Sequence, residues 1–217
     1  MPSATQLSHP LKPRLQQGLD SLQCLLGDTG QGQLLQLVDL LDKWNRVYNL
    51  TAIRNPADML AQHIFDSLSI RPFLHDDHIL DVGSGAGLPG LPLAIAEPQR
   101  EFVLLDSNSK KTRFINQAIA ELQLANVSVV QARVEAYRPD ASFSCIVSRA
   151  FATLGDFING CAHLCSQETV LLAMKGRHPQ DEIAAMPDTW VVSAEHELSV
   201  PGVTGERRCL EIMQKNV

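Results

Sequence analysis

A glycine-rich stretch, LDVGSGAGLPG at residues 80–90, carries the strongest chemical signal in this chain. Its glycines, which directly follow a short apolar run, are Gly83, Gly85, Gly87 and Gly90. Because glycine has no Cβ, such a turn lets the backbone come close to a bound ligand. A dinucleotide, a nucleoside triphosphate and S-adenosylmethionine can all be held in this way. Tight packing of a strand against a helix is the alternative, which three glycines at alternate positions make less attractive.

The residues around the glycines discriminate between these ligands. No Gly-Lys-Ser/Thr follows, so nothing is placed for a triphosphate and its magnesium ion. Residues 85–90 match G-x-G-x-x-G, and Asp106 stands 21 residues after Gly85, where a dinucleotide-binding domain has a ribose-binding carboxylate. However, Asp81 and Gly83 precede that match and extend it to D-x-G-x-G-x-G. This longer pattern favours S-adenosylmethionine.

S-adenosylmethionine contains no pyrophosphate, so a carboxylate close to the turn is tolerated. Asp81 is then able to orient the ammonium group of the ligand. Asp106 is expected to accept hydrogen bonds from the ribose hydroxyls of the adenosine, which is the same chemistry that a dinucleotide requires.

Basic residues follow two later apolar runs and are candidates for contacts with phosphate. Arg149 and Lys175 are expected at the carboxyl ends of strands, where open α/β sheets bind ligands. A guanidinium can hold a phosphate or the cofactor, although a surface salt bridge is the alternative for Arg149. A solvated lysine is an equally good interpretation of Lys175. Further residues of an expected basic rim are Lys110, Lys111, Arg113, Arg133, Arg177, Arg207 and Arg208.

The elements that must position these residues alternate along the chain. Short apolar runs predict strands at 78–82, 101–106, 127–132, 143–150 and 169–176. Helical patterns lie between them at 89–97, 110–122 and about 154–164. This alternation predicts parallel strands joined by right-handed crossovers, which is an open α/β sheet. Two final strand-like runs, 189–200 and 207–215, have no helix pattern between them and predict an antiparallel pair that ends the sheet.

Residues 1–75 are expected to form a helical extension packed on a main domain of residues 76–217. A first helix is predicted by an apolar stripe at helical spacing: Leu34, Leu35, Leu37, Val38, Leu40, Leu41, Trp44, Val47 and Tyr48. Trp44 and Tyr48 are expected in the core rather than as a platform for nucleic-acid bases. A second helix is predicted from about Pro56 to Ile70. The segment GDTGQG at 27–32 predicts a loop before the stripe.

Composition limits the function classes. With 217 residues, 45% of them hydrophobic and 19% charged, the chain is long enough for one globular domain with an extension. A net charge of −6 argues against a broadly basic nucleic-acid-binding surface, but it permits a local basic face. No apolar run is long enough to cross a membrane, and the N-terminus lacks the pattern of a signal peptide. We therefore expect a cytoplasmic protein.

Cysteine and histidine residues give little support for a metal site. The five cysteines are scattered and are expected to be reduced thiols. Cys161 and Cys165 are spaced i,i+4, but nothing nearby completes a set of four ligands, so small buried side chains are the better interpretation. His63 and Asp66 share one helix turn and are expected to make structural hydrogen bonds rather than to form a catalytic pair. No metal is predicted.

Several segments together resemble a known family, the bacterial ribosomal RNA small-subunit methyltransferase G family (RsmG, formerly GidB). The matching segments are WNRVYNLTAIRNPADMLAQHIFDSL at 44–68, DVGSGAGLPGLPLAI at 81–95, LLDSNSKKTRF at 104–114, ARVEAY at 132–137, SRAFATL at 148–154, MKG at 174–176 and GERR at 205–208. The resemblance runs in family order over about residues 34–210, nearly the whole chain. The first segment is the most specific, because generic methyltransferases lack it.

The resemblance implies a Rossmann-like class I S-adenosylmethionine-dependent methyltransferase fold. It also implies methylation at N7 of a guanine in the 530 loop of 16S rRNA, the position called G527. The expected cofactor site contains Gly83, Gly85, Gly87, Leu88, Asp106, Val134, Glu135 and Arg149. The expected contacts to RNA are Arg149, Lys175, Lys110, Lys111 and Arg207. By family analogy, a monomer acts on the 30S subunit.

Guanine N7 has a free lone pair and carries no proton, so its methylation does not require a general base. Alignment of the reacting atoms and desolvation are expected to supply most of the acceleration. We therefore assign no acid or base residue. An oxidoreductase that uses a nicotinamide cofactor and an RNA-associated module with a decayed site are the alternative functions.

Overall fold

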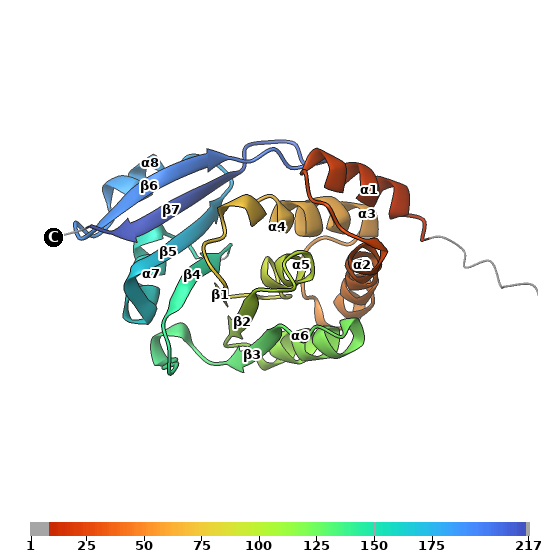
Figure 1. Cartoon of the computed structure of the whole chain (residues 1–217), viewed down its shortest axis with the longest axis horizontal. Coiled ribbons are helices and arrows are strands. Elements are labelled where there is room, and N and C mark those ends of the chain that lie inside the picture. Colours follow the sequence, from red (N-terminus) through yellow and green to blue (C-terminus); the bar gives the residue numbers. More distant parts are fainter. Residues whose placement is uncertain (1–8, 150, 216–217) are drawn as a thin grey trace, which may run out of the picture.

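The computed structural model describes residues 9–149 and 151–215, which form an α/β fold around one seven-stranded sheet (Figure 1). The strands run in the order β3-β2-β1-β4-β5-β7-β6. The pairs among β1 to β5 are parallel, whereas β7 is antiparallel to both β5 and β6. The predicted open sheet and its closing antiparallel pair are confirmed.

The strands lie close to the predicted ranges. They are β1 (His78–Val82), β2 (Glu101–Asp106), β3 (Val127–Gln131), β4 (Phe143–Ser148), β5 (Cys165–Lys175), β6 (Trp190–Glu197) and β7 (Arg208–Gln214). Strand β5 begins four residues earlier than predicted, and β4 ends at Ser148. Residue 150, at the end of the predicted fourth strand, lies outside the described residues, as do residues 1–8 of the expected extension.

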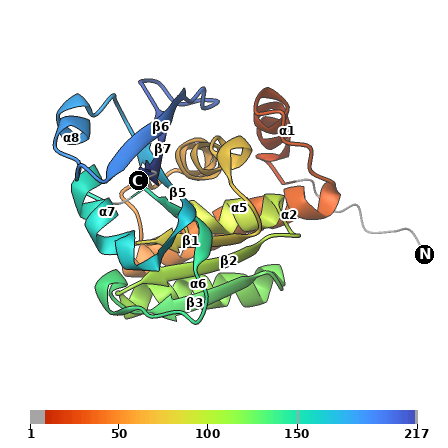
Figure 2. The same cartoon turned by 60° about the vertical axis from the view of Figure 1, so that its left-hand side comes forward.

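Helices cover both faces of the sheet (Figures 1 and 2). One face carries α5 (Gly90–Ala96) and α6 (Ser109–Leu122), with α1 (Lys12–Ser21) and α2 (Asp28–Tyr48) beside them. The other face carries α7 (Leu154–Cys161), followed by a 3-10 turn at Ala162–Leu164, and the sequence did not predict the short α8 (Gln180–Ala184). Between β3 and β4 there is only a 3-10 turn at Val134–Ala136.

Helix α2 corrects two predictions. The segment at 27–32 is not a loop, because Gly27 is the N-cap of α2 and the helix begins at Asp28. Glycine and aspartate are favoured at helix starts as well as in turns, so composition alone could not separate the two. At the other end, Val47 was predicted to belong to the buried apolar stripe, but it is 69% exposed. It lies nine residues after Val38, which at 100° per residue places it on the opposite side of the helix.

The second predicted helix contains a wide turn. It is continuous from α3 (Pro56–Met59) through a π-helical turn, η1 (Leu60–Phe65), to α4 (Asp66–Leu68), and a 3-10 turn at Arg71–Phe73 follows. The Asn55 side chain caps its start by accepting a hydrogen bond from the backbone N–H of residue 57.

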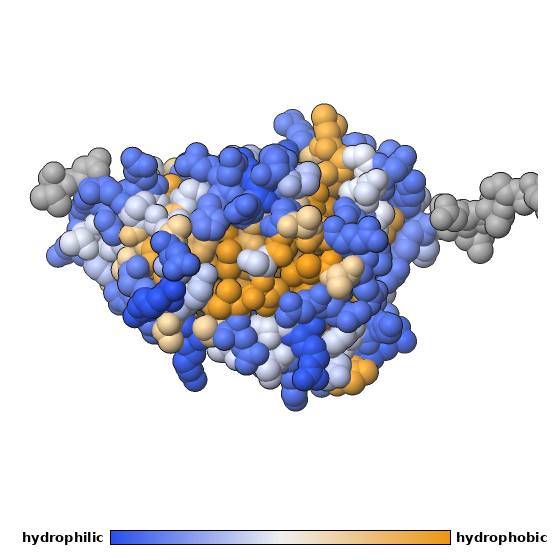
Figure 3. Space-filling view, turned by 60° about the horizontal axis from the view of Figure 1, so that its bottom comes forward, coloured by the Kyte–Doolittle hydropathy of each residue, from blue (hydrophilic) through white to orange (hydrophobic). Residues whose placement is uncertain are grey.

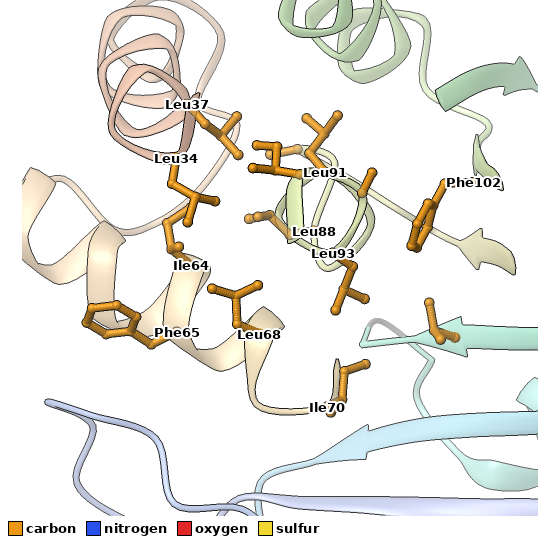
Figure 4. Close-up of a cluster of buried hydrophobic side chains, with 14 of the residues drawn as sticks. Leu34, Leu37, Ile64, Phe65, Leu68, Ile70, Leu88, Leu91, Leu93 and Phe102 are labelled. Atoms are coloured by element: carbon orange, nitrogen blue, oxygen red, sulfur yellow. The ribbon is translucent and has the colours of Figure 1, made fainter. Parts of the chain in front are cut away.

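The helices before β1 share one apolar core with the sheet. In Figure 4, Leu34 of α2, Ile64 and Leu68 converge with Leu88 and Leu91 of the segment after β1. All five side chains are buried. Burying this much apolar surface ties the helical extension to the sheet, so the two parts are not separated by a flexible linker.

Trp44 and Tyr48 have different environments. Trp44 packs against Phe114 of α6, with ring centroids 5.6 Å apart. Tyr48 is 38% exposed and covers the outer side of Trp44, so the prediction that it lies in the core is wrong.

The surface in Figure 3 is mostly hydrophilic around a central apolar area. Across residues 9–149 and 151–215, no helix has the length and apolar composition that crossing a membrane would need.

All five cysteines are free thiols, as predicted.

Candidate functional site

The backbone conformation of the glycine-rich turn between β1 and α5 explains why its sequence contains glycines. Gly83, Gly85 and Gly87 have φ values of 69°, 59° and 74°, in the left-handed region that other residues rarely adopt. The backbone N–H groups of Gly83 and Ser84 both donate to the carbonyl oxygen of Leu105, at 2.8 and 3.1 Å. The turn is therefore fastened to the end of the neighbouring strand β2.

Asp106 is the last residue of β2 and lies directly beside this turn. Its Oδ2 atom accepts a hydrogen bond from the backbone N–H of Gly85 at 2.8 Å, and its Oδ1 atom accepts one from Asn108 at 2.8 Å. The Nζ atom of Lys111 is 3.7 Å from Oδ2. An ionised carboxylate has about four acceptor positions. The two backbone bonds leave room for two donors from a ligand.

A cavity of about 280 Å³, which we call the turn cavity, opens beside these residues. Its lining includes the predicted cofactor residues Gly83, Asp106, Val134 and Glu135, together with Lys111. Phe151, which the sequence did not single out, adds an apolar ring. The structure thus combines a glycine turn, a carboxylate and apolar side chains, which suits a nucleoside.

Two further predicted residues reach this cavity only indirectly. Gly87 shapes the turn, since a Cβ there would lie 2.4 Å from Leu91. Leu88 as a whole is 3% exposed and belongs to the apolar core, and its backbone N–H donates to the carbonyl oxygen of Ser84 at 2.8 Å, so it does not line the turn cavity.

Asp81 does not face a ligand. Its side chain is completely buried, and Oδ2 accepts a hydrogen bond from the backbone N–H of Gly90 at 2.8 Å. Burial raises the pKa of the Asp81 carboxyl to about 7, although the hydrogen bond from Gly90 acts in the opposite direction. The expected contact between Asp81 and an ammonium group is therefore ruled out. The residue instead joins the end of β1 to the start of α5.

A second cavity of about 380 Å³ lies where β4 and β5 end, and we call it the arginine cavity. It brings together three residues predicted to contact RNA, namely Arg149, Lys175 and Arg207. Arg149 lines this cavity and Phe151 lines the turn cavity, so the chain after β4 borders both. Lys111 faces the turn cavity, whereas Lys110 is exposed and lines neither.

Acidic partners hold the basic residues of the arginine cavity. The Nη1 atom of Arg149 is 3.1 Å from Oδ2 of Asp66, and the Nε atom of Arg207 is 3.4 Å from Oδ1 of the same carboxylate. The Nζ atom of Lys175 is 2.7 Å from Oε2 of Glu182 in α8. A larger depression of about 1100 Å³ adjoins this cavity and shares Lys175 and Arg207 with it.

His63 has a structural role, as predicted, but its partner is not Asp66. Its Nε2 atom is 2.9 Å from Oγ1 of Thr51, and its Nδ1 atom is 3.1 Å from the carbonyl oxygen of Gln62. Burial lowers the pKa of the His63 imidazole to about 4, and the charge of Arg149 acts in the same direction. The ring is therefore neutral at pH 7. Among the described residues, no three His, Cys, Asp or Glu side chains are grouped so as to hold a metal ion.

The sequence did not identify Asp66 or Glu182 as partners of the basic residues. Asp66 stands out in the sequence only for its spacing from His63, and its partner Arg149 is 83 residues away. Glu182 lies on a helix of five residues, too short to give a periodic pattern. Their acidic character was the only signal that the sequence offered for either pairing.

Comparison with known proteins gives the family. A family model described as rRNA small subunit methyltransferase G (GidB) matches residues 31–211. The ribosomal RNA small subunit methyltransferase G of Pseudomonas aeruginosa is 54% identical over 197 residues, which are 90% of this chain and 92% of that protein. The protein of the same name from Idiomarina loihiensis is 48% identical over 206 residues, 95% of this chain and 100% of that protein.

Solved structures agree on the fold. The N-methyltransferase NodS from Bradyrhizobium japonicum, solved with S-adenosyl-L-homocysteine, has a TM-score of 0.57 at 14% identity, covering 82% of this chain and 99% of that chain. A ribosomal protein L11 methylase from Lactobacillus delbrueckii has a TM-score of 0.53 at 16% identity, covering 70% and 77%. These likenesses confirm the Rossmann-like methyltransferase fold. From the family model and the close relatives together, we conclude that this chain belongs to the rRNA small subunit methyltransferase G family.

Proposed function

We propose that this protein transfers the methyl group of S-adenosylmethionine to N7 of a guanine in the 530 loop of 16S rRNA, the position called G527. The observation that carries the proposal is that the turn cavity and the arginine cavity border the same segment after β4. One cavity suits a nucleoside, and the other gathers positive charge. A cofactor and an RNA nucleotide can therefore meet there.

The turn cavity is the proposed cofactor site. The free acceptor positions of Asp106 suit ribose hydroxyls, and the backbone of the turn at Gly83, Gly85 and Gly87 is proposed to approach the amino-acid part of the cofactor. Leu88, predicted here from the family resemblance, supports the turn from the apolar core. Val134 and Glu135 also line this cavity. Arg149 was predicted to bind the cofactor from the family resemblance, but it lines the arginine cavity and not the turn cavity.

The arginine cavity is the proposed RNA site. Arg149, Lys175 and Arg207 can bind phosphate oxygens, since guanidinium groups match phosphate geometry and lysine adds a point charge. Lys110 and Lys111, at the start of α6, are proposed to contact RNA on the other side of the turn cavity. The protein as a whole is acidic, so binding relies on this local concentration of positive charge.

The proposed methyl transfer does not require a side chain that acts as an acid or a base. S-adenosylmethionine, when bound, supplies a methyl group on a positively charged sulfur. Guanine N7 has a lone pair and no proton, so no residue would have to act as a base for the methyl group to pass from sulfur to nitrogen and leave S-adenosylhomocysteine behind. The protein's contribution is to orient the two reactants and to exclude water. This agrees with His63, the histidine of the arginine cavity, being neutral and bonded to Thr51.

The organisation and setting of the protein complete the proposal. We assign residues 1–75 to a helical extension and residues 76–217 to the catalytic domain, which is supported by the core that helices α1 to α4 share with the sheet. The protein acts as a cytoplasmic monomer on 16S rRNA within the 30S subunit.

The experiment is methylation of small subunits from a bacterial strain that lacks this enzyme, with the modified base mapped. We expect one new N7-methylguanine in the 530 loop, formed only with S-adenosylmethionine. S-adenosylhomocysteine should raise the melting temperature of the protein, and NADH should not. Methylation at another base, or stabilisation by NADH alone, would contradict the proposal.

A further inference from the structure

Asp66 connects three distant parts of the chain. It lies on α4, at the end of the helical extension, and its side chain is 7% exposed. Arg149 follows strand β4 and Arg207 precedes β7, and one guanidinium pairs with each carboxylate oxygen of Asp66. A single carboxylate from the extension thus pairs with two guanidiniums from the segments that adjoin strands β4 and β7.

The shape of the helix before Asp66 supports this arrangement. In the π-helical turn at Leu60–Phe65, the carbonyl oxygen of Gln62 accepts a second hydrogen bond from Nη1 of Arg149, at 3.2 Å. Wide turns of this kind are found frequently at functional sites. Arg149 is therefore held by two acceptors that both come from this helix.

The contacts leave binding capacity on both arginines. The bonds of Arg149 use only its Nη1 atom, and Nε and Nη2 have no acceptor among the described residues. The Nε atom of Arg207 forms an ion pair with Asp66 without a hydrogen bond, and its Nη1 atom donates to the carbonyl oxygen of Glu206. Two guanidiniums and one carboxylate carry a net charge of about +1, so the group still attracts an anion.

We propose that Asp66 is a positioning residue, which holds the guanidiniums of Arg149 and Arg207 side by side to receive a phosphodiester group of the RNA. The inference rests on the proposed function, since RNA is the assumed substrate. Without the carboxylate, two like charges would repel each other and turn toward solvent. With it, they are preorganised for bidentate contacts with phosphate oxygens.

The chain contains a matched control. Glu97 is also a buried carboxylate between two arginines, 3.2 Å from Arg71 and 3.5 Å from Arg100. Its side chain is 11% exposed, and it lies after α5, away from both cavities. Loss of its charge therefore has the same kind of effect on folding, without an effect on RNA.

The test compares Asp66→Asn, Asp66→Glu and Glu97→Gln with the wild-type protein. For Asp66→Asn we expect KM for the 30S subunit to rise about tenfold or more, with kcat and the Kd of S-adenosylhomocysteine changed less than about twofold. Asp66→Glu restores the charge and should recover part of the KM. Glu97→Gln should lower the melting temperature but keep KM unchanged.

Direct binding of a single-stranded RNA oligonucleotide separates this inference from the proposed function. The slope of log K against log salt concentration should become smaller in Asp66→Asn, by about 0.7 for each phosphate that the variant no longer neutralises. Should the wild type fail to methylate 30S subunits, the proposed function fails while this measurement still tests Asp66. Equal RNA affinity and equal salt slopes in Asp66→Asn and Glu97→Gln would overturn the role of Asp66.

Discussion

The Oδ2 atom of Asp81 accepts a hydrogen bond of 2.8 Å from the backbone N–H of Gly90, inside a region with no exposed surface. This contact joins the end of β1 to the first residue of α5 and so closes the glycine-rich turn from behind. It makes the conformation of the turn depend on two residues that a ligand does not touch. Both can be tested without a substrate.

Replacing Gly90 with alanine should destabilise the protein. An added Cβ would lie 2.8 Å from Oδ2 of Asp81 and 2.9 Å from Leu104, and neither is free to move in the core. We expect a loss of about 1–3 kcal/mol in the free energy of unfolding, measured by urea denaturation. Gly32→Ala is the control. That glycine lies within α2 and has nothing within 4 Å, so alanine should stabilise by about 0.5–1 kcal/mol. Equal effects of the two substitutions would contradict the packing argument.

Asp81→Asn should change how stability depends on pH. Because burial raises the pKa of Asp81 from 3.8 to about 7, the folded protein keeps a proton that the unfolded chain releases between these values. The wild type therefore loses stability as pH rises from 4 to 7, by up to a few kcal/mol, and the loss is complete above that range. Asparagine still accepts the bond from Gly90 and has no proton to lose. Urea titrations at pH 5 and pH 8 should show that the free energy of unfolding of the variant rises relative to that of the wild type between these pH values. If the difference in this free energy between the two proteins is the same at both pH values, the raised pKa is contradicted.

His63→Gln should also change how stability depends on pH, in the direction opposite to Asp81→Asn. Since the pKa of His63 is lowered from 6.5 to about 4, the unfolded chain binds a proton in this range and the folded protein does not. The wild type is thus destabilised as pH falls from 6.5 toward 4, by up to roughly 3 kcal/mol. Glutamine removes this contribution. The melting temperatures of wild type and variant, compared at pH 7 and pH 5, should diverge, with the wild type falling further. His9→Gln is a control, because that residue lies outside the core.

The sheet was predicted well from the sequence, because the patterns that indicate its strands and helices lie within short stretches of the chain. Alternating apolar runs and helix patterns specify a parallel sheet, and the glycines needed for left-handed φ values stand directly in the turn. The start of α2 was missed for a similar local reason. Gly27 and Asp28 suit both a loop and a helix N-terminus, so local composition does not separate the two. The first turns of α2 also contact α6, where the side chain of Gln33 donates to the carbonyl oxygen of Leu122, 89 residues away.

Roles that depend on pairing could not be read from the sequence. Asp81 and Asp106 both lie at strand ends next to the glycine turn, yet one is completely buried and the other lines the turn cavity. Only the packing of α5 over Asp81 separates their roles. Arg149 was correctly placed at a strand end, but Asp66, which holds it, comes from another layer of the fold.

Asp106→Asn should weaken the binding of S-adenosylhomocysteine. The substitution keeps one acceptor oxygen for the backbone of residue 85 or 108 but loses the other, so the turn cavity can no longer satisfy both the turn and a ribose. Hydrogen bonds to a charged group contribute about 1.5–3 kcal/mol, which predicts a loss of roughly tenfold to a hundredfold in affinity by calorimetry. Glu101→Gln, at the exposed start of the same strand, is the control and should bind normally. Unchanged affinity in Asp106→Asn would place the ribose elsewhere.

Arg149→Ala and Lys175→Ala should weaken RNA methylation far more than cofactor binding. Both side chains line the arginine cavity, where each is held by a carboxylate beside the space that RNA is proposed to enter. Loss of a guanidinium that contacts phosphate should raise KM for the 30S subunit by about tenfold or more, with a smaller effect from the lysine. Arg46→Ala is the control, since that side chain is 74% exposed on α2 and pairs with Asp42 in the adjacent turn. Steady-state methylation with varied 30S subunits, together with calorimetry for S-adenosylhomocysteine, measures both effects. Turnover equal to that of the wild type in both variants would remove the arginine cavity from the proposed RNA site.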